Sequence, residues 1–184
     1  MIITEFTPFP VLTTERLLLR AITKEDVKDI FAMRSDKSVM KYIGRPLAKT
    51  LDDAEKLIEM IQGIVTENKG INYGITIKGS DRIIGTVGFW NMSKPDGRAE
   101  IGYMLHGDFH QKGIMPEALT AVLKYGFEKM NLHSVEARVH PENSPSIRVL
   151  LKKGFKKEAH FRQNYFFEGA FLDTVAFGLL KSEY

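Results

Sequence analysis

Residues 100–121 read Glu-Ile-Gly-Tyr-Met-Leu-His-Gly-Asp-Phe-His-Gln-Lys-Gly-Ile-Met-Pro-Glu-Ala-Leu-Thr-Ala, and this stretch decides the fold. Its first part alternates with the period of two that is typical of a β-strand. Ile101, Tyr103 and Leu105 point one way, and Glu100, Gly102 and Met104 point the other. Apolar residues then recur at helical spacing: Leu119, Val122, Leu123, Phe127 and Met130. The stretch predicts a strand, a short loop and a helix.

The loop Gln111-Lys112-Gly113-Ile114-Met115 leads into the N-terminus of that helix, and Pro116 suits its first turn. The first N–H groups of a helix have no internal partner, and the helix dipole adds partial positive charge there. Gly113 lets the backbone approach an anion closely, and Lys112 adds a charge. We therefore expect a phosphate or pyrophosphate site. Considered alone, the stretch fits an ordinary strand-to-helix turn equally well.

A second segment, residues 135–155, contains a strand that ends at His140-Pro141. Ser144 is expected to cap the following helix, with Pro145 at its first position and Gly154 at its end. These positions set the length of the helix and its distance from the anion loop.

With the block Asn143-Ser-Pro-Ser146 and Gly154-Phe155 at this distance from the loop, the chain resembles the GCN5-related N-acetyltransferases (GNAT). Within that family it is similar to the ribosomal-protein-type (RimJ/RimL-like) branch. The resemblance runs from Leu12-Thr-Thr-Glu-Arg-Leu-Leu-Leu-Arg to Asp173-Thr-Val-Ala-Phe-Gly-Leu-Leu, which is nearly the whole chain.

Residues 1–184 are expected to form a single mixed α/β domain. Further strands are predicted at residues 17–22, 71–77, 82–90, 155–165 and 172–180, and helices after the caps Thr23 and Thr50, with an irregular segment at 35–49. We expect a central, mostly antiparallel sheet, splayed at two parallel strands, with helices on both faces. The anion loop then lies where the antiparallel and parallel halves meet, a usual position for ligands.

Composition excludes several classes of function. The chain has no cysteine, which excludes thiolate catalysis, disulfides and cysteine-based metal sites. Its five histidines are scattered without metal-ligand spacing. A net charge of +3 without a dense basic stripe does not favour nucleic-acid binding. No stretch approaches a membrane span, and the first residues do not read as a signal peptide, so a cytoplasmic protein is expected.

The resemblance implies acetyl-CoA as the cosubstrate and no metal. It places the pyrophosphate on the backbone N–H groups of residues 111–115 and the pantetheine arm along Met104 and Leu105. The expected coenzyme contacts are Met104, Leu105, His110, Gln111, Lys112, Gly113, Ile114, Met115, Pro116, Asn143 and Ser146.

Two loop residues depart from the pattern of the family, which usually has Gln or Arg in place of His110 and Gly or Ala in place of Met115. Met115 would crowd the phosphates if its side chain pointed at them. As a lone histidine, His110 is more often solvated or held in a structural hydrogen bond than used as a ligand contact.

Many relatives carry a tyrosine where this chain has Leu150, so Ser146 is expected to protonate the leaving thiolate, unless it only makes a local helix hydrogen bond. Glu100 is the expected base if it faces the cleft; otherwise it pairs with Arg98 or Arg82. Tyr165, Glu168 and water are further candidates for the base. The residues expected around the acceptor amine are Tyr42, Trp90, Tyr165 and Glu168.

The resemblance implies direct transfer of an acetyl group from acetyl-CoA to a primary amine, with the α-amine of a protein N-terminus favoured, such as that of a ribosomal protein. The first alternative is a small-molecule acceptor such as a polyamine, an amino acid or an aminoglycoside. The second is a coenzyme-A-binding module that has lost catalysis. A homo-oligomer is compatible with the sequence. Likeness of fold does not choose among these acceptors.

Overall fold

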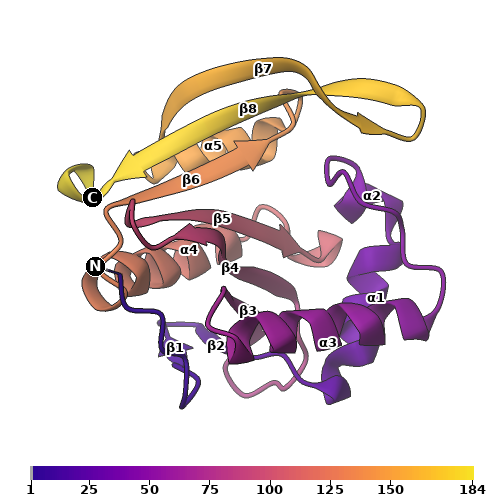
Figure 1. Ribbon diagram of the computed structural model, residues 1–184. Helices are drawn as coiled ribbons and strands as arrows, with labels where there is room; N and C mark the ends of the chain where they lie inside the picture. The colour runs from indigo at the N-terminus through magenta and orange to yellow at the C-terminus, as the bar shows by residue number, and fades with distance from the viewer. Residues whose placement is uncertain (1) are drawn as a thin grey trace.

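The computed structural model describes residues 2–184, and a single twisted sheet runs through it (Figure 1). The strands are β1 (Leu12–Thr13), β2 (Leu17–Ala21), β3 (Ile71–Ile77), β4 (Gly85–Ser93), β5 (Arg98–Leu105), β6 (Ser134–Val139), β7 (Lys156–Phe167) and β8 (Ala170–Leu180). They lie in the order β1-β2-β3-β4-β5-β6-β8-β7. Neighbouring strands pair antiparallel, except that β5 and β6 are parallel.

Helices cover both faces of this sheet, as the sequence predicts. Their bounds are α1 (Val27–Ser35), α2 (Lys37–Met40), α3 (Leu51–Thr66), α4 (Ile114–Lys124) and α5 (Ser144–Lys152), with a π turn, η3 (Tyr125–Lys129), continuing α4. Short 3-10 turns are η1 (Lys24–Asp26), η2 (Gly107–Phe109) and η4 (Lys181–Glu183). Helices α1 and α3 pack on one face, and α4 and α5 pack on the other. In residues 2–184 no helix combines the length and apolarity needed to cross a bilayer.

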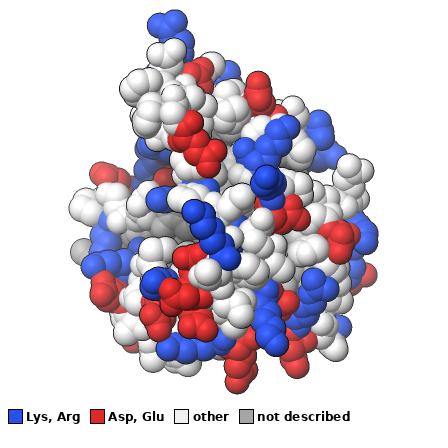
Figure 2. Space-filling model, turned by 90° about the vertical axis from the view of Figure 1, so that its right-hand side faces the viewer, with Lys and Arg blue, Asp and Glu red and all other residues white. Residues whose placement is uncertain are grey.

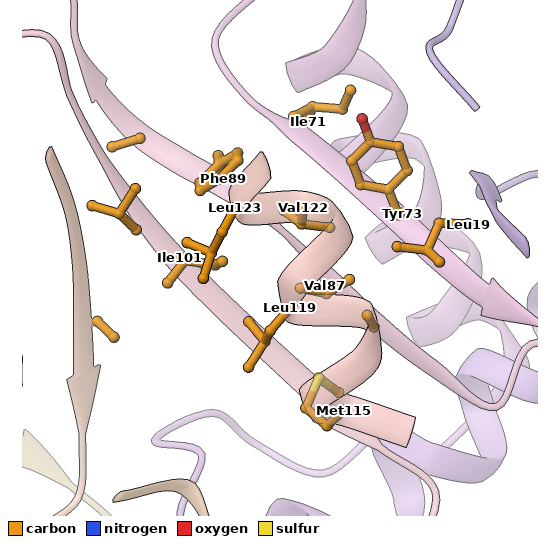
Figure 3. Packing of buried hydrophobic residues seen from close by; sticks show 14 of the residues in the cluster. Leu19, Ile71, Tyr73, Val87, Phe89, Ile101, Met115, Leu119, Val122 and Leu123 are labelled. Atoms are coloured by element: carbon orange, nitrogen blue, oxygen red, sulfur yellow. The ribbon is translucent and has the colours of Figure 1, made fainter. Parts of the chain in front are cut away.

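The position of α4 is set by its apolar side, which packs on the middle of the sheet (Figure 3). Leu119, Val122 and Leu123 are fully buried there. They contribute to the same core cluster as Val87 and Ile101 of the sheet. Burying one such side chain stabilises the fold by about 1.5–3 kcal/mol. Because α4 is held along its length, the loop before it is also fixed relative to β5.

The parallel pair β5–β6 separates soon after it begins. The two strands are in register only at Arg98↔Ser134, Ala99↔Val135 and Glu100↔Glu136. Strand β5 nevertheless continues to Leu105, and β6 continues to Val139. From Ile101 onward one backbone edge of β5 therefore lacks a strand partner among residues 2–184. This is the predicted splay, and it opens toward the carboxyl ends of both strands.

The structure corrects several local predictions. The segment 35–49 contains α2, because the Asp36 side chain accepts hydrogen bonds from the N–H groups of Ser38 and Val39. The strand predicted from residue 82 begins at Gly85, since the Ile83 N–H donates to Asp29 (2.9 Å). Strand β1 was not predicted, and the cap of α5 is Asn143 rather than Ser144.

Candidate active site

A cavity of about 600 Å³ occupies the splay between β5 and α5. It is lined from α2 and the residues after it, from the end of β5, from the loop before α4 and from α5: Ser38, Val39, Tyr42, Ile43, Tyr103, Met104, Leu105, Phe109, His110, Gln111, Gly113, Ile114, Met115, Pro116, Asn143, Pro145, Ser146, Arg148, Val149 and Lys152. Every predicted coenzyme contact except Lys112 lines this cavity. Among the predicted acceptor residues, Tyr42 lines it.

The loop before α4 presents backbone N–H groups to the cavity. Gln111 and Gly113 have the left-handed φ values +61° and +75°, and Gly113 is the N-cap residue of α4. The backbone N–H groups of residues 111–115 make no hydrogen bond within the part of the chain that the structure describes. Successive N–H groups in such a turn, at the start of an eleven-residue helix, form a cradle for an anion.

Two residues far away in the sequence, Thr14 and Arg16, hold this loop in place. Glu117, in the first turn of α4, accepts hydrogen bonds from the Thr14 hydroxyl and from Arg16 Nε (2.7 Å). Arg16 also donates through Nη1 to the carbonyl oxygen of Lys112 (3.1 Å). Burial alone would raise the pKa of Glu117, but the hydrogen bonds from Thr14 and Arg16 outweigh it and lower that pKa. The sequence reasoning missed these supports, although both donors lie in the quoted Thr-Thr-Glu-Arg stretch.

Lys112 lies beside the cavity rather than in it. Its ammonium group is 5.4 Å from the centre of the Phe109 ring, a cation–π contact. It lines a second hollow of about 440 Å³, together with Arg16 and Lys78. Lys112 therefore adds a diffuse positive potential to the loop.

The two unusual loop residues have structural positions. The ring of His110 makes a hydrogen bond between Nε2 and the carbonyl oxygen of Leu105 (2.9 Å), which ties the loop to the end of β5. The side chain of Met115 is only 6% exposed and packs in the core under α4 (Figure 3). It therefore does not crowd the space in front of the loop.

Ser146 meets a partner that the sequence did not reveal. The hydroxyl oxygens of Ser146 and Tyr103 are 2.7 Å apart, within hydrogen-bonding distance, and both residues line the cavity. Burial raises the pKa of Tyr103 to about 12 against the opposing effect of this hydrogen bond. Asn143 accepts a hydrogen bond from the backbone N–H of Ser146 (3.2 Å), so its side chain caps α5.

Of the two tyrosines predicted near the acceptor, Tyr42 lines the cavity and Tyr165 lies outside its lining. Tyr42 stacks on His140, with 5.4 Å between the ring centres. Tyr165, from β7, lies against Gly44 so closely that a Cβ at Gly44 would be 2.9 Å from the Tyr165 ring. This contact joins the segment after α2 to the β7–β8 hairpin. Burial raises the pKa of Tyr165.

The remaining predicted residues, Glu100, Trp90 and Glu168, also lie outside the lining of the cavity. Glu100 accepts a hydrogen bond from the Asn91 side chain (2.9 Å); the expected pairing with Arg98 or Arg82 is wrong, because those cations pair with Glu136 and Asp29. Trp90 lies over Gly102, where a Cβ would be 2.1 Å from its ring. Glu168 sits in the exposed turn between β7 and β8, with φ +48°.

The Lys, Arg, Asp and Glu side chains that line the cavity are all of positive sign. Arg148 and Lys152 stand four residues apart on α5 and both line it, a spacing that places them on one helix face. No Asp or Glu belongs to the lining within residues 2–184. Over the face toward which β5 and β6 point, basic and acidic side chains are otherwise interspersed (Figure 2).

Comparison with known proteins agrees with this geometry. The family model described as "Acetyltransferase (GNAT) domain" matches residues 16–156. The chain is 38% identical over 173 residues to the uncharacterized N-acetyltransferase p20 of Bacillus licheniformis, covering 94% of this chain and 97% of that protein. A crystal structure of a GNAT-family acetyltransferase from Bacillus anthracis superposes with a TM-score of 0.85 at 30% identity, covering 95% of this chain and all of that one.

Two more distant relatives are named by different acceptors. The [ribosomal protein uS5]-alanine N-acetyltransferase of Escherichia coli is 24% identical over 181 residues, covering 94% of this chain and 92% of that protein. The spermidine N(1)-acetyltransferase of Vibrio cholerae is 22% identical over 169 residues, covering 92% and 95%.

Proposed function

The chain belongs to the GNAT family of acetyl-CoA-dependent N-acetyltransferases, and we propose that it acetylates the α-amine of a protein or peptide N-terminus by direct transfer. Transfer is direct because the sequence has no cysteine to carry the acetyl group. The observation that carries the choice of acceptor is the one-sided charge of the cavity.

The residues of the cavity fit coenzyme A. The N–H cradle of residues 111–115 suits the pyrophosphate, and the cations Arg148 and Lys152 suit a further phosphate. The edge of β5 beyond Glu100, which has no strand partner in residues 2–184, offers backbone groups to the pantetheine amides, and Met104 and Leu105 line the cavity beside it. Asn143 lies on the opposite wall of the cavity, at the start of α5, where it can contact the pantetheine arm. When bound, acetyl-CoA supplies the activated acetyl group, while these residues orient it.

A polyamine acceptor carries several positive charges, and carboxylates are the groups that bind such charges in proteins. The lining of this cavity contains cations and aromatic rings but no carboxylate within residues 2–184. An N-terminal peptide brings one amine, which must be neutral to react, and an amide backbone that Tyr42 and Tyr165 can flank. The charge pattern therefore favours an acceptor like that of the uS5-alanine enzyme over one like that of the spermidine enzyme.

A module without catalysis is the less favoured alternative. The sequence suggested it because of His110, Met115 and Leu150. In the structure His110 and Met115 hold the loop and the core without filling the cavity. The hydroxyl groups of Ser146 and Tyr103 also lie together in the cavity, and they could donate a proton to the leaving thiolate.

The test is release of coenzyme A from acetyl-CoA in the presence of three acceptor sets at equal concentration. The sets are short peptides with free N-termini, the same peptides with blocked N-termini, and small amines including spermidine. We expect the free-N-terminus peptides to have a kcat/KM at least tenfold above that of spermidine. Faster turnover of spermidine would overturn the choice of acceptor, and no turnover with any amine would overturn the enzymatic assignment.

We further propose that Glu100 removes the amine proton through water, because no carboxylate of the described chain lines the cavity itself. Glu100→Gln should lower kcat by about 100-fold or more, since the amide cannot accept the proton. The matched control is Glu158→Gln, an exposed carboxylate on β7 outside the cavity. An unchanged kcat in Glu100→Gln would leave Glu100 as the partner of Asn91 alone.

A further inference from the structure

Two hydroxyl groups from opposite walls of the cavity meet across the splay. Tyr103 stands on β5 beyond the last residue that pairs with β6, and Ser146 stands in the first turn of α5. Their oxygens are 2.7 Å apart. We propose that Tyr103 is a positioning residue for acyl transfer: its hydroxyl donates to Ser146 Oγ and thereby directs the proton of Ser146 into the cavity, toward the leaving sulfur. This inference rests on the proposed function.

Either hydroxyl could donate at this distance, and the proposed direction, with Tyr103 as the donor, is the one that leaves the Ser146 proton free. A serine hydroxyl has one proton and two lone pairs. In the first turn of a helix that proton commonly goes to a nearby backbone acceptor, which would make it useless for chemistry. The backbone of Ser146 is already fixed by Asn143, so only its hydroxyl rotor remains to be set. Burial keeps the Tyr103 phenol protonated throughout the pH range in which an enzyme works, so a proton is present on it to donate to Ser146.

The proton balance of the step is complete. When the C–S bond of the thioester breaks, the electron pair leaves on sulfur and the Ser146 proton passes to it, giving the thiol of coenzyme A. As that proton leaves, the Tyr103 proton passes to Ser146 Oγ, and the phenol is restored from water. The amine nitrogen has meanwhile lost one proton, through water, to Glu100, which returns it to solvent. The sum is amine plus thioester giving amide plus thiol.

The sequence position at which many relatives carry a tyrosine, Leu150 in this chain, has no access to the cavity. Leu150, seven residues after Asn143, is fully buried and belongs to the core cluster beneath α5. A side chain there points away from the cavity, so a polar group at that position would have no reaction to serve. The hydroxyl in this chain comes instead from β5, on the other wall.

The first experiment compares Tyr103→Phe with Tyr73→Phe. Tyr73 is a matched control on the same sheet: it is fully buried, and no hydrogen-bond partner for its hydroxyl is found in the described chain. Tyr103→Phe should lower kcat by about 10- to 100-fold with the KM for acetyl-CoA changed by less than about twofold. Tyr73→Phe should leave kcat unchanged.

A double-variant cycle separates a shared role from two independent ones. If Tyr103 acts through Ser146, Tyr103→Phe in a Ser146→Ala background should lower kcat by less than about twofold further. Independent roles would instead multiply the two losses, and multiplied losses would overturn the proposal.

The second experiment needs no turnover. A donated hydrogen bond stabilises a thiolate, so the thiol of bound coenzyme A should titrate about one pH unit lower in the wild type than in Tyr103→Phe. The ultraviolet absorbance of the thiolate reports this titration, with bound desulfo-coenzyme A as the blank. Equal titration midpoints in the two proteins, or an unchanged kcat in Tyr103→Phe, would overturn the proposal. A wild type that acetylates no amine but still shows the titration difference would instead overturn the proposed function.

Discussion

The Gly113→Pro variant should bind acetyl-CoA at least 100-fold more weakly than the wild type, whereas Lys112→Ala should lose about fivefold or less. Gly113 has φ +75°, which proline cannot adopt because its ring fixes φ near −65°. The proline also removes one N–H of the cradle. The cost of such a misplaced proline is about 3 kcal/mol or more, and 1.4 kcal/mol corresponds to tenfold in affinity.

Lys112→Ala is the comparison variant because Lys112 is the one cation in the loop 111–115 and so the side chain that the sequence alone suggests as a phosphate ligand. Its ammonium group lies over Phe109 and outside the lining of the main cavity. Removing one screened charge near a helix N-terminus costs about 1 kcal/mol or less. Isothermal titration calorimetry on the folded variants measures both effects.

Two further variants guard this comparison against a folding artefact. Gly79→Pro places a proline at another glycine of positive φ (+82°), in the open turn after β3, and should leave the affinity unchanged. Gly113→Ala keeps the N–H and meets only the end of the Arg16 side chain, 3.4 Å from the new Cβ, so its loss should be intermediate. Equal losses in Gly113→Pro and Lys112→Ala would refute the role of the backbone N–H groups.

The parts of the fold that depend on local pattern were predictable from the sequence. Alternation over Ile71–Ile77 and the apolar stripe of α4 each repeat often enough to be unambiguous, and both elements form as expected. Strand β1 has two residues and α2 has four, which is too short for any period to show. Strand β1 forms only through its pairing with β2, and α2 begins at the cap provided by Asp36.

The candidate site divides in the same way. The anion loop is one continuous segment, so its residues were predictable together. Tyr103 was not, because its place in the alternation of β5 assigns it to the core, and its partner Ser146 is 43 residues away in the chain. Arg16 is likewise 101 residues from Glu117. Contacts of this kind depend on how elements that are distant in the sequence pack together, which no local pattern encodes.

The sheet beside the cavity should be unusually sensitive at one glycine of β4. Gly88 pairs with Asn72 of β3 and Gly102 of β5. A Cβ at Gly88 would lie 2.2 Å from the carbonyl oxygen of Ile71 and 2.6 Å from the Cα of Asn72. Both are backbone atoms of the neighbouring strand, so neither can move aside without breaking the pairing of β3 with β4.

Gly88→Ala should therefore lower the free energy of unfolding by about 3 kcal/mol, the upper end of what overpacking usually costs. For a chain of this size that corresponds to a fall in Tm of about 6–12 °C. Gly63→Ala is the matched control, because no atom lies within 4 Å of a Cβ at Gly63 and the residue is inside α3. Alanine is the better helix former by about 0.5–1 kcal/mol, so this variant should be more stable than the wild type. Urea unfolding of the three proteins measures the difference. If Gly88→Ala unfolds within 0.5 kcal/mol of the wild type, then β3 and β4 do not approach each other as closely as the structure has them.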